Sequence, residues 1–435
     1  MRTTTHLVRR SAYAAALALL VTGVASVPAL AAGTTPTTLA PSDGAGGDLF
    51  GESTATSSNG AVTAVGSPEH NSSGAVYVFT GIGAAASQTA ELTPSNPQAD
   101  EQFGQTVAIS GDGQTLVAAA PGAAGASGSD QGAAYVFTNQ AGTWTQIAEL
   151  AVPGTSELGT SLAISSDAST IVLGSPTSNN DNGEAFVFTK SGSTYVQTQE
   201  LTASTTSTSS AKGMARTVSA AKKKPKPTPS PTPTPAVPDF LGDNSAISSN
   251  GSTIAFGEPN VGATVVFTKA SGASAWTQTA QLNGGGDSVA VSGNGAIVAA
   301  GQTGINNLNG AVFVFTESGG TFTEASEVLP PANTTNAAFA AGSNVGMSAD
   351  GSTIAFGAPT ATAGTAFESG EVFVATETNG TWALTGTDAE PNPVSDDDLG
   401  GGDQSVAVAG NGSAIVAGAR AANGQTGQAF VFPVS

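Results

Sequence analysis

The sequence contains no cysteine, which excludes disulfide bonds, thiolate nucleophiles and cysteine metal ligands. Packing and hydrogen bonds must therefore hold the fold together. Histidine is almost as scarce, with His6 near the N-terminus and His70 further along. A Ser-His-Asp site in the main part of the chain would have to use His70. Because His70 stands in the polar segment SPEHNSSG, between two predicted strands, we do not expect it to be catalytic.

Positive charge is also scarce. Of the 12 Lys and Arg residues, three lie in the first ten positions and six lie between residues 202 and 238. Only Lys190, Lys269 and Arg420 remain elsewhere, against 32 Asp and Glu in the whole chain. A surface this acidic repels nucleic acid and anionic lipid, so we expect neither as a partner. A high net negative charge keeps a protein soluble, and solubility outside the cell is sufficient to explain this acidity.

Long apolar runs are confined to the N-terminus. Residues 1–31 begin with arginines, continue through AYAAALALLVTGVASV and end in ALA, the order of a secretory signal peptide. No other stretch reaches the ~18 apolar residues that a membrane span needs. We therefore predict a soluble, exported protein, secreted or held at the cell surface, with a mature chain of residues 32–435. The pair Arg9-Arg10 would suit a twin-arginine route, but ordinary secretion is favoured because nothing in the sequence indicates a bound cofactor.

What the sequence has in abundance is repetition. One hexapeptide with a glycine followed by β-branched and aromatic residues recurs seven times, a composition that is typical of a strand. Its copies are GAVYVF from Gly74, GAAYVF from Gly132, GEAFVF from Gly183, GATVVF from Gly262, GAVFVF from Gly310, GEVFVA from Gly370 and GQAFVF from Gly427.

A short polar motif precedes each hexapeptide and is bracketed by strand-like runs. Its copies are SSNG at Ser57, SGDG at Ser110, SSDA at Ser165, SSNG at Ser248, SGNG at Ser292, SADG at Ser348 and AGNG at Ala409. Asn-Gly and Asp-Gly between strands favour hairpin turns, because they tolerate the positive φ that such turns need. Calcium needs six or more oxygens, which Asp112, Asp167 or Asp350 alone cannot supply. We predict turns that bind no metal.

A fourth strand-like run closes most repeats, as in TWTQIAEL and TYVQTQEL. Four strands per repeat and seven repeats predict an all-β fold, a seven-bladed β-propeller with four-stranded antiparallel blades. The first two runs of each repeat are rich in Ala, Gly and Val, which suits the crowded axis. The fourth run carries an aromatic position, which we expect to pack in the core rather than to bind sugar. This position is filled by Trp144, Tyr195, Trp276, Phe322 and Trp382.

The seventh repeat ends at Ser435 without a fourth run. The segment Thr34 to Gly51 aligns without gaps to Ser87 to Gly104, so that Leu39 matches Leu92. We therefore predict that Thr35 to Leu39 supplies the fourth strand of the last blade, paired with Gln428 to Phe432. The alternative is that this threonine-rich segment is a disordered leader left after cleavage.

These motifs resemble the FG-GAP repeat family, whose best-known members form the seven-bladed head of integrin α chains, and especially its short secreted bacterial variants. The repeats open with Phe50-Gly51, Phe103-Gly104, Leu158-Gly159 and Leu241-Gly242, and second runs end in GSP at Gly66 and Gly174, GEP at Gly257 and GAP at Gly357. In repeats five to seven, GG at Gly285, AG at Ala341 and GGGD at Gly400 replace the phenylalanine. Integrin-type repeats often carry a multi-aspartate calcium loop, which the short turns here do not match.

One insert interrupts the repeats between the third and fourth. Residues 202–238 are rich in Lys, Pro and Thr, contain no acids and have almost no large apolar groups. Such a segment cannot pack, so we predict a disordered, extended loop leaving the rim of the propeller. The alternatives are that its six cations bind an anionic wall polymer or fold against the acidic propeller.

Other candidate sites are weaker. Asp396, Asp397, Asp398 and Asp403 form the densest acidic loop and could hold one cation, but a solvated loop is favoured. The GGGD run at Gly284 is followed by a strand rather than by a helix and a lysine, so it does not predict a phosphate site. No two carboxylates stand out by spacing as a glycosidase pair.

Two classes of function remain. By analogy with the fold, the first is a non-catalytic scaffold, an expected monomer without a cofactor, that binds an extracellular protein or glycan through loops at the propeller faces. The second is a secreted carboxylate-dependent enzyme acting on polysaccharide. It would require an axial pocket that holds two carboxylates ~5 to 9.5 Å apart.

Overall fold

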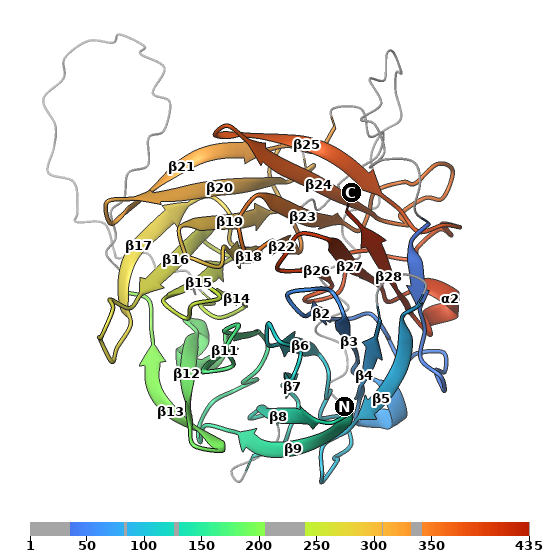
Figure 1. Cartoon of the computed structure of the whole chain (residues 1–435), viewed down its shortest axis with the longest axis horizontal. Coiled ribbons are helices and arrows are strands. Elements are labelled where there is room, and N and C mark those ends of the chain that lie inside the picture. The colour runs from blue at the N-terminus through green and yellow to red at the C-terminus, as the bar shows by residue number, and fades with distance from the viewer. Residues whose placement is uncertain are drawn as a thin grey trace, which may run out of the picture.

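The computed structural model describes residues 35–81, 85–125, 130–204, 240–306, 308–331 and 342–434. Seven four-stranded antiparallel sheets are arranged around one axis, which confirms the predicted seven-bladed β-propeller (Figure 1). The predicted signal peptide at residues 1–31 lies outside the described residues, and so does the predicted insert from residue 205 onward.

In every blade the first strand lies at the axis and the fourth at the rim (Figure 1). Blade one comprises β2 (Thr54–Thr56), β3 (Val62–Ser67), β4 (Ala75–Thr80) and β5 (Ser87–Leu92). Blade two comprises β6 (Thr106–Ile109), β7 (Thr115–Ala120), β8 (Ala133–Gln140) and β9 (Thr143–Leu150). Blade three comprises β10 (Leu162–Ile164), β11 (Thr170–Ser175), β12 (Glu184–Ser191) and β13 (Thr194–Leu201). Blade four comprises β14 (Asn244–Ile247), β15 (Thr253–Glu258), β16 (Ala263–Thr268) and β17 (Thr277–Asn283).

The remaining blades follow the same order. Blade five comprises β18 (Ser288–Val291), β19 (Ile297–Gln302), β20 (Ala311–Ser318) and β21 (Thr321–Val328). Blade six comprises β22 (Val345–Met347), β23 (Thr353–Ala358), β24 (Glu371–Thr378) and β25 (Thr381–Asp388). Blade seven comprises β26 (Val406–Val408), β27 (Ala414–Ala419), β28 (Gln428–Pro433) and β1 (Thr37–Leu39). Single helical turns lie between second and third strands: η2 (His70–Ser72), α1 (Ser178–Asp181) and α2 (Ala422–Gln425).

The outer strand of blade seven comes from the other end of the chain, as predicted. β1 pairs antiparallel with β28, with Leu39 opposite Ala429 and Thr37 opposite Val431. The side chain of Leu39 is buried in a cluster with Phe50, Tyr77 and Val431. The N-terminal strand therefore covers the edge that β28 would otherwise expose and fastens blade seven to blade one.

The core lies between neighbouring blades. Second strands such as β7 are buried along their whole length, whereas fourth strands such as β5 alternate and bury only one face. The phenylalanine that opens a repeat packs edge-on against the aromatics of a third strand, as Phe50 does with Tyr77 at a centroid distance of 5.5 Å. Burying one face of each sheet against the next is what makes the ring a single packed unit.

Glycines are required where consecutive blades meet. A Cβ built on Gly66, at the end of β3, would lie 1.9 Å from the carbonyl oxygen of Gly104, which opens blade two. Gly104 itself has a φ of +91°, a conformation that L-residues rarely adopt. The same approach occurs at the closure, where a Cβ on Gly418 would lie 1.9 Å from the carbonyl oxygen of Gly51. The glycine that ends a second strand and the glycine that opens the next repeat therefore lie in direct contact, and this contact recurs between blades.

Blade seven requires a correction to the sequence alignment. The GGGD run at Gly400 was expected to replace the opening phenylalanine, but the fully buried Leu399 takes that place. Leu399 forms an isolated parallel β-bridge with Gly370, as Phe103 does with Gly74. The three residues 401–403 are an insertion between this anchor and β26, which places Leu399 further from the next turn than the other anchors.

The seven short motifs form hairpin turns between first and second strands, as predicted. Their backbones are linked around the axis by one hydrogen bond per junction. In N–H to O=C order, the bonds are Ser58 to Gly111, Gly111 to Ser166, Ser166 to Ser249, Asn250 to Gly293, Gly293 to Ala349, Ala349 to Gly410 and Asn411 to Ser58. The last bond closes the ring.

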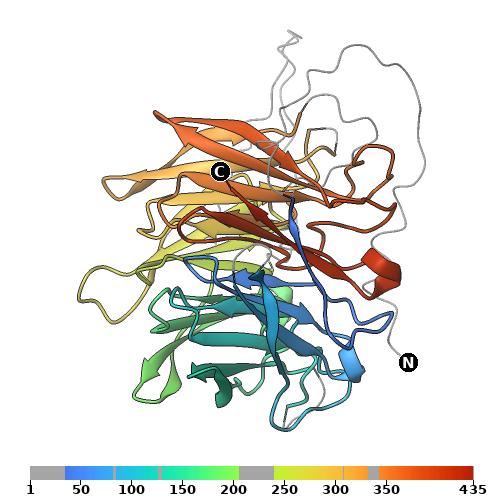
Figure 2. The same ribbon diagram turned by 45° about the vertical axis from the view of Figure 1, so that its right-hand side comes forward.

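Antiparallel strands place alternate connections on opposite sides of the ring. We call the side with these turns the hairpin face. The opposite side, which we call the long-loop face, carries the connections from second to third strands and from each blade to the next. Figure 2 shows the hairpin tips on one side and α2 on the other.

Candidate functional site

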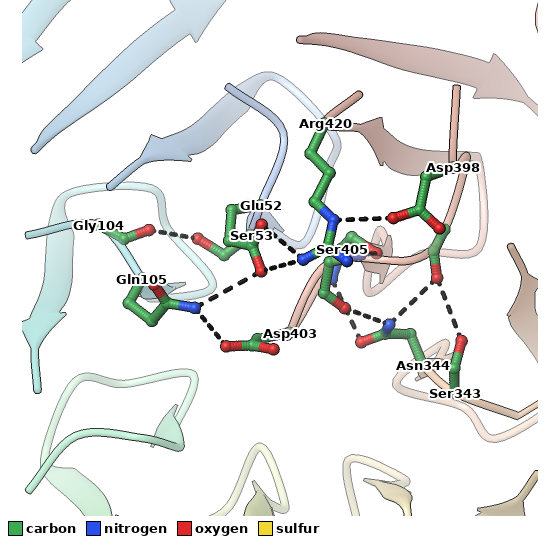
Figure 3. Close-up of polar contacts among 12 residues, drawn as sticks. Glu52, Ser53, Gly104, Gln105, Ser343, Asn344, Asp398, Asp403, Ser405 and Arg420 are labelled. Atoms are coloured by element: carbon green, nitrogen blue, oxygen red, sulfur yellow. Dashed lines mark hydrogen bonds and ion pairs between the residues drawn. The ribbon is translucent and has the colours of Figure 1, made fainter. Parts of the chain in front are cut away.

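The best-organised charged group lies where blades one and seven meet on the long-loop face (Figure 3). Glu52 precedes β2 and its side chain is 3% exposed, while Arg420 directly follows β27. Arg420 donates from Nη1 to both carboxylate oxygens of Glu52, at 2.7 and 2.9 Å, and from Nε to Asp398 at 2.8 Å. Gln105 of blade two donates to Asp403 and, at 3.5 Å, to Glu52.

Burial dominates the electrostatics of this group. It raises the pKa of Glu52 to about 7, although the Arg420 guanidinium pulls in the opposite direction. Burial also acts to lower the pKa of Arg420, but the charges of Glu52 and Asp398 outweigh it and raise that pKa. The arginine therefore stays charged and holds two carboxylates from different blades. This arrangement joins the first blade to the last and offers no free nucleophile.

The acidic loop at residues 396–403 is not uniformly solvated, which corrects the sequence interpretation. Asp396 is exposed, but Asp397 is only 4% exposed. Asp398 contacts Arg420, so the cation beside the loop is a protein guanidinium. Burial, and a hydrogen bond with Asp397, raise the pKa of the neighbouring Glu390 to about 8. Glu390 and Asp397 thus form a buried carboxyl pair in direct contact.

The axial cavity lies at the hairpin face. It has a volume of about 160 Å³, and the first strand of each blade contributes one residue to its wall. These seven residues are Thr56, Ile109, Ile164, Ile247, Val291, Met347 and Val408. The other lining positions belong to the hairpin turns, and among the lining residues that the structure describes none is acidic. The cavity therefore lacks the carboxylate pair that a polysaccharide-cleaving site requires.

His70 lies in η2 on the long-loop face and is 4% exposed. Its Nδ1 lies 2.9 Å from Asp48, and its Nε2 lies 2.7 Å from the amide of Asn71. Asp43 and Glu91 face Nε2 at 3.7 and 3.8 Å. The ring is therefore surrounded by carboxylates rather than aimed at a serine. The sequence did not indicate this group, because its members come from separate segments of the chain.

The aromatic row of the fourth strands packs as predicted. Tyr195, Trp276 and Trp382 are 6, 2 and 8% exposed, and Trp144 and Phe322 pack partly buried against the core. The Nζ of Lys269 lies 3.7 Å from the ring centroid of Trp276 and covers that face. These rings are not a sugar-binding row.

Exposed apolar side chains gather on the long-loop face. Six large hydrophobic residues in the described part of the chain are markedly exposed, and the only one within a strand is Val196, in β13. The five in long-loop connections are Val261, Leu308, Leu329, Phe367 and Val394. Phe367 and Val394 are 46 and 62% exposed and lie on two loops tied together, because Phe367 donates its N–H to Ser395 at 3.1 Å.

Acidic residues follow the same distribution. Among described residues, only Asp112, Asp167 and Asp350 lie in the hairpin turns. The long-loop connections hold Asp43, Asp48, Glu52, Glu69, Asp100, Glu101, Asp130, Glu157, Asp181, Asp243, Asp287, Glu368, Glu390, Asp396, Asp397, Asp398 and Asp403. Lys190 and Lys269 lie towards the hairpin face, which leaves Arg420 as the cation of the described long loops. The long-loop face thus combines apolar and strongly acidic surface.

No curated protein matches the sequence. Many solved structures match this chain, and two of them illustrate the shared fold at low identity. The β-propeller domain of Cps50 (Swd1) from Myceliophteria thermophila has a TM-score of 0.54 and 10% identity, with 92% of this chain and 98% of that chain covered. A protein of Bacteroides uniformis that is provisionally named a 6-phosphogluconolactonase has a TM-score of 0.51 and 13% identity, with 82 and 87% covered. At these identities the likeness shows the fold alone.

None of the helices in the described part of the chain has the length and apolar character of a membrane span.

A family model described as FG-GAP repeat matches residues 34–79 and 86–137. The first match runs from β1 through β4 and the second from β5 into β8. The sequence repeat is thus offset by one strand from the structural blade, and this offset is what makes β1 complete blade seven. The chain therefore carries FG-GAP repeats at these residues, and its described residues form a seven-bladed β-propeller.

Proposed function

We propose that the protein is a non-catalytic interaction scaffold, secreted or held at the cell surface, that binds an extracellular partner through its long-loop face. The single observation that carries the proposal is the patch formed by Phe367, Val394, Glu368 and Asp396. The two apolar side chains are about half exposed, and Asp396 donates its N–H to the carbonyl of Phe367 at 3.0 Å. Exposed apolar groups rimmed by charge mark interaction sites.

The chemistry of this patch favours a partner with basic and apolar groups. Burial, and then the charges of Asp396 and Asp398, raise the pKa of Glu368, so the carboxylates there repel one another. A lysine or arginine from a partner would relieve this repulsion, while an apolar side chain would cover Phe367. A basic protein segment therefore suits the patch better than a neutral glycan, although a glycan elsewhere on the face is the other partner class that we predicted.

The alternative, a carboxylate-dependent enzyme acting on polysaccharide, has less support. The axial cavity has no acidic residue among its described lining. Glu390 and Asp397 are a carboxyl pair, but they are in direct contact and are 6 and 4% exposed. A glycosidase pair must be reachable and ~5 Å or more apart to accommodate the sugar.

The test compares matched exposed sites. The immobilised protein is probed with synthetic peptides that combine Leu or Phe with Lys and Arg, with the same peptides carrying Glu instead, and with a glycan array. We expect binding of the basic peptides that weakens with salt and falls at least tenfold in a Phe367→Ser, Val394→Ser variant. Val196→Ser removes an equally exposed residue from β13 and should have no effect.

Two outcomes would contradict the proposal. Equal binding by the patch variant and the Val196→Ser control would place recognition elsewhere on the molecule. Turnover of a polysaccharide, lost on changing acidic residues, would favour the enzyme.

A further inference from the structure

The group around His70 has the composition of a metal site. Three ligand atoms from three segments converge: Nε2 of His70 in η2, a carboxylate oxygen of Asp43 between β1 and β2, and one of Glu91 in β5. All three atoms lie within 4.8 Å of one another. Nε2 is 3.7 Å from Asp43 Oδ2 and 3.8 Å from Glu91 Oε1.

The surroundings orient these atoms. Asp48, whose side chain is 9% exposed, lies 2.9 Å from Nδ1 of His70. When Nδ1 donates its proton to Asp48, the lone pair of the imidazole is on Nε2, between the two carboxylates. Tyr77 donates its hydroxyl to Oδ1 of Asp43 at 2.9 Å, which leaves Oδ2 facing His70. A carboxylate behind a histidine ligand is the usual supporting shell of a metal site.

We propose that His70, Asp43 and Glu91 bind a divalent transition metal of the Zn²⁺ class, with Asp48 as a positioning residue. Ligands at 2.0 to 2.1 Å from a tetrahedral ion are about 3.4 Å apart, so the two measured separations need to close by only a few tenths of an ångström. One imidazole with two carboxylates suits Zn²⁺, whereas Ca²⁺ prefers six to eight oxygens. The side chains of Asp43 and Glu91 are 48 and 34% exposed, so a water molecule can complete the coordination.

One contact must change on binding. The Asn71 amide nitrogen lies 2.7 Å from Nε2 of His70 and donates to the same lone pair that a metal would use. Asn71 is exposed, so its side chain can turn towards solvent. The bound ion would then link the segment after β1 to blade one. Metal binding should therefore stabilise the junction at which the ring closes, independently of any partner on the long-loop face.

The test is titration of the chelator-treated protein with Zn²⁺ by calorimetry, followed by thermal unfolding with and without the ion. We expect one ion per chain and a higher melting temperature when the site is saturated. Asp43→Asn and Glu91→Gln should each weaken Zn²⁺ binding at least tenfold, and Asp48→Asn about 10- to 100-fold. Glu69→Gln is the matched control, because Glu69 is an exposed acid beside His70 that lies outside the group.

The variants can be checked for folding, since Asp43 and Glu91 are exposed and their metal-free unfolding should match that of the control. Co²⁺ in place of Zn²⁺ gives a visible spectrum that should change in the Asp43→Asn and Glu91→Gln variants but not in Glu69→Gln. The absence of saturable Zn²⁺ binding, or equal affinity in these variants and the control, would overturn the proposal and leave Asp43 and Glu91 only as acidic neighbours of His70.

Discussion

The hairpin face and the long-loop face are built from the same repeats but obey different constraints. On the hairpin face, seven short turns are joined around the axis by one backbone hydrogen bond per junction. On the long-loop face, the connections differ in length and sequence from blade to blade, and they carry His70, Arg420 and the exposed Phe367. Closure of the ring thus fixes one face and frees the other for chemistry.

Three acidic residues on the two faces show opposite pKa shifts. On the hairpin face, hydrogen bonds from Ser348 and Ser352 lower the pKa of Asp350. On the long-loop face, burial raises the pKa of Glu52 to about 7 and that of Glu390 to about 8. Asp350 is a local hydrogen-bond acceptor at the surface, whereas Glu52 and Glu390 are held in low-dielectric surroundings.

Removing Arg420 should produce the largest loss of stability. Arg420→Met leaves Glu52 buried without its partner, which costs about 3 to 5 kcal/mol for a buried pair. Urea unfolding at pH 8, where Glu52 is ionised in the wild type, measures the loss. The double variant Glu52→Gln, Arg420→Met should regain much of it, because no buried charge is then left uncompensated. An equal loss in both variants would show that packing of the arginine, rather than charge pairing, matters.

Shortening Leu39 should have the next largest effect. Leu39→Ala removes a side chain that is 2% exposed, and buried Leu→Ala changes cost roughly 2 to 5 kcal/mol. Thr38→Ala is the control, since Thr38 is exposed on the same strand and should change stability by less than about 0.5 kcal/mol. Hydrogen exchange gives a second measure, because the amides of β1 should lose protection in Leu39→Ala. Equal stability of the two variants would mean that blade seven does not depend on its N-terminal strand.

The sequence predicted the blades, the turns and this donated strand because each follows from a local pattern that repeats seven times. It did not predict the contact between Glu52 and Arg420, which are 368 residues apart and occur once. Leu399 was missed for a related reason, since a three-residue insertion shifted it away from its repeat position. Periodic positions are readable from one chain, but contacts made only where the ring closes require its three-dimensional arrangement.

Stability should fall as the pH rises from about 5 to about 8. The folded-state pKa of Glu390 is about 8, above its ordinary value, so the folded protein holds a proton that the unfolded chain releases near pH 4.5. This contribution is complete below that pH and is lost as the pH passes the folded-state value. Glu390→Gln should flatten the pH profile of urea unfolding, and the exposed control Glu69→Gln should not. A profile that both variants share with the wild type would exclude Glu390 as its source.

The smallest effect is expected in the hairpin turns. Asp350 accepts hydrogen bonds from the hydroxyl of Ser348 at 2.6 Å and from the N–H of Ser352 at 3.0 Å. In blade one, Asn59 accepts the equivalent bonds from Ser57 and Ala61 at 2.9 and 3.0 Å. Because one oxygen suffices for both bonds, Asp350→Asn should change stability at pH 7 by less than about 0.5 kcal/mol.

Asp350→Ala is the informative companion to Asp350→Asn, because it removes the acceptor and should cost about 1 kcal/mol. Calcium should leave the melting temperatures of wild type and both variants unchanged. A turn that keeps its hydrogen bonds when asparagine replaces aspartate does not need the carboxylate to bind a metal. A calcium-dependent rise that occurs in wild type and disappears in Asp350→Asn would show that the carboxylate charge has a function. The hairpin face would then share the chemistry that the structure otherwise places on the long-loop face.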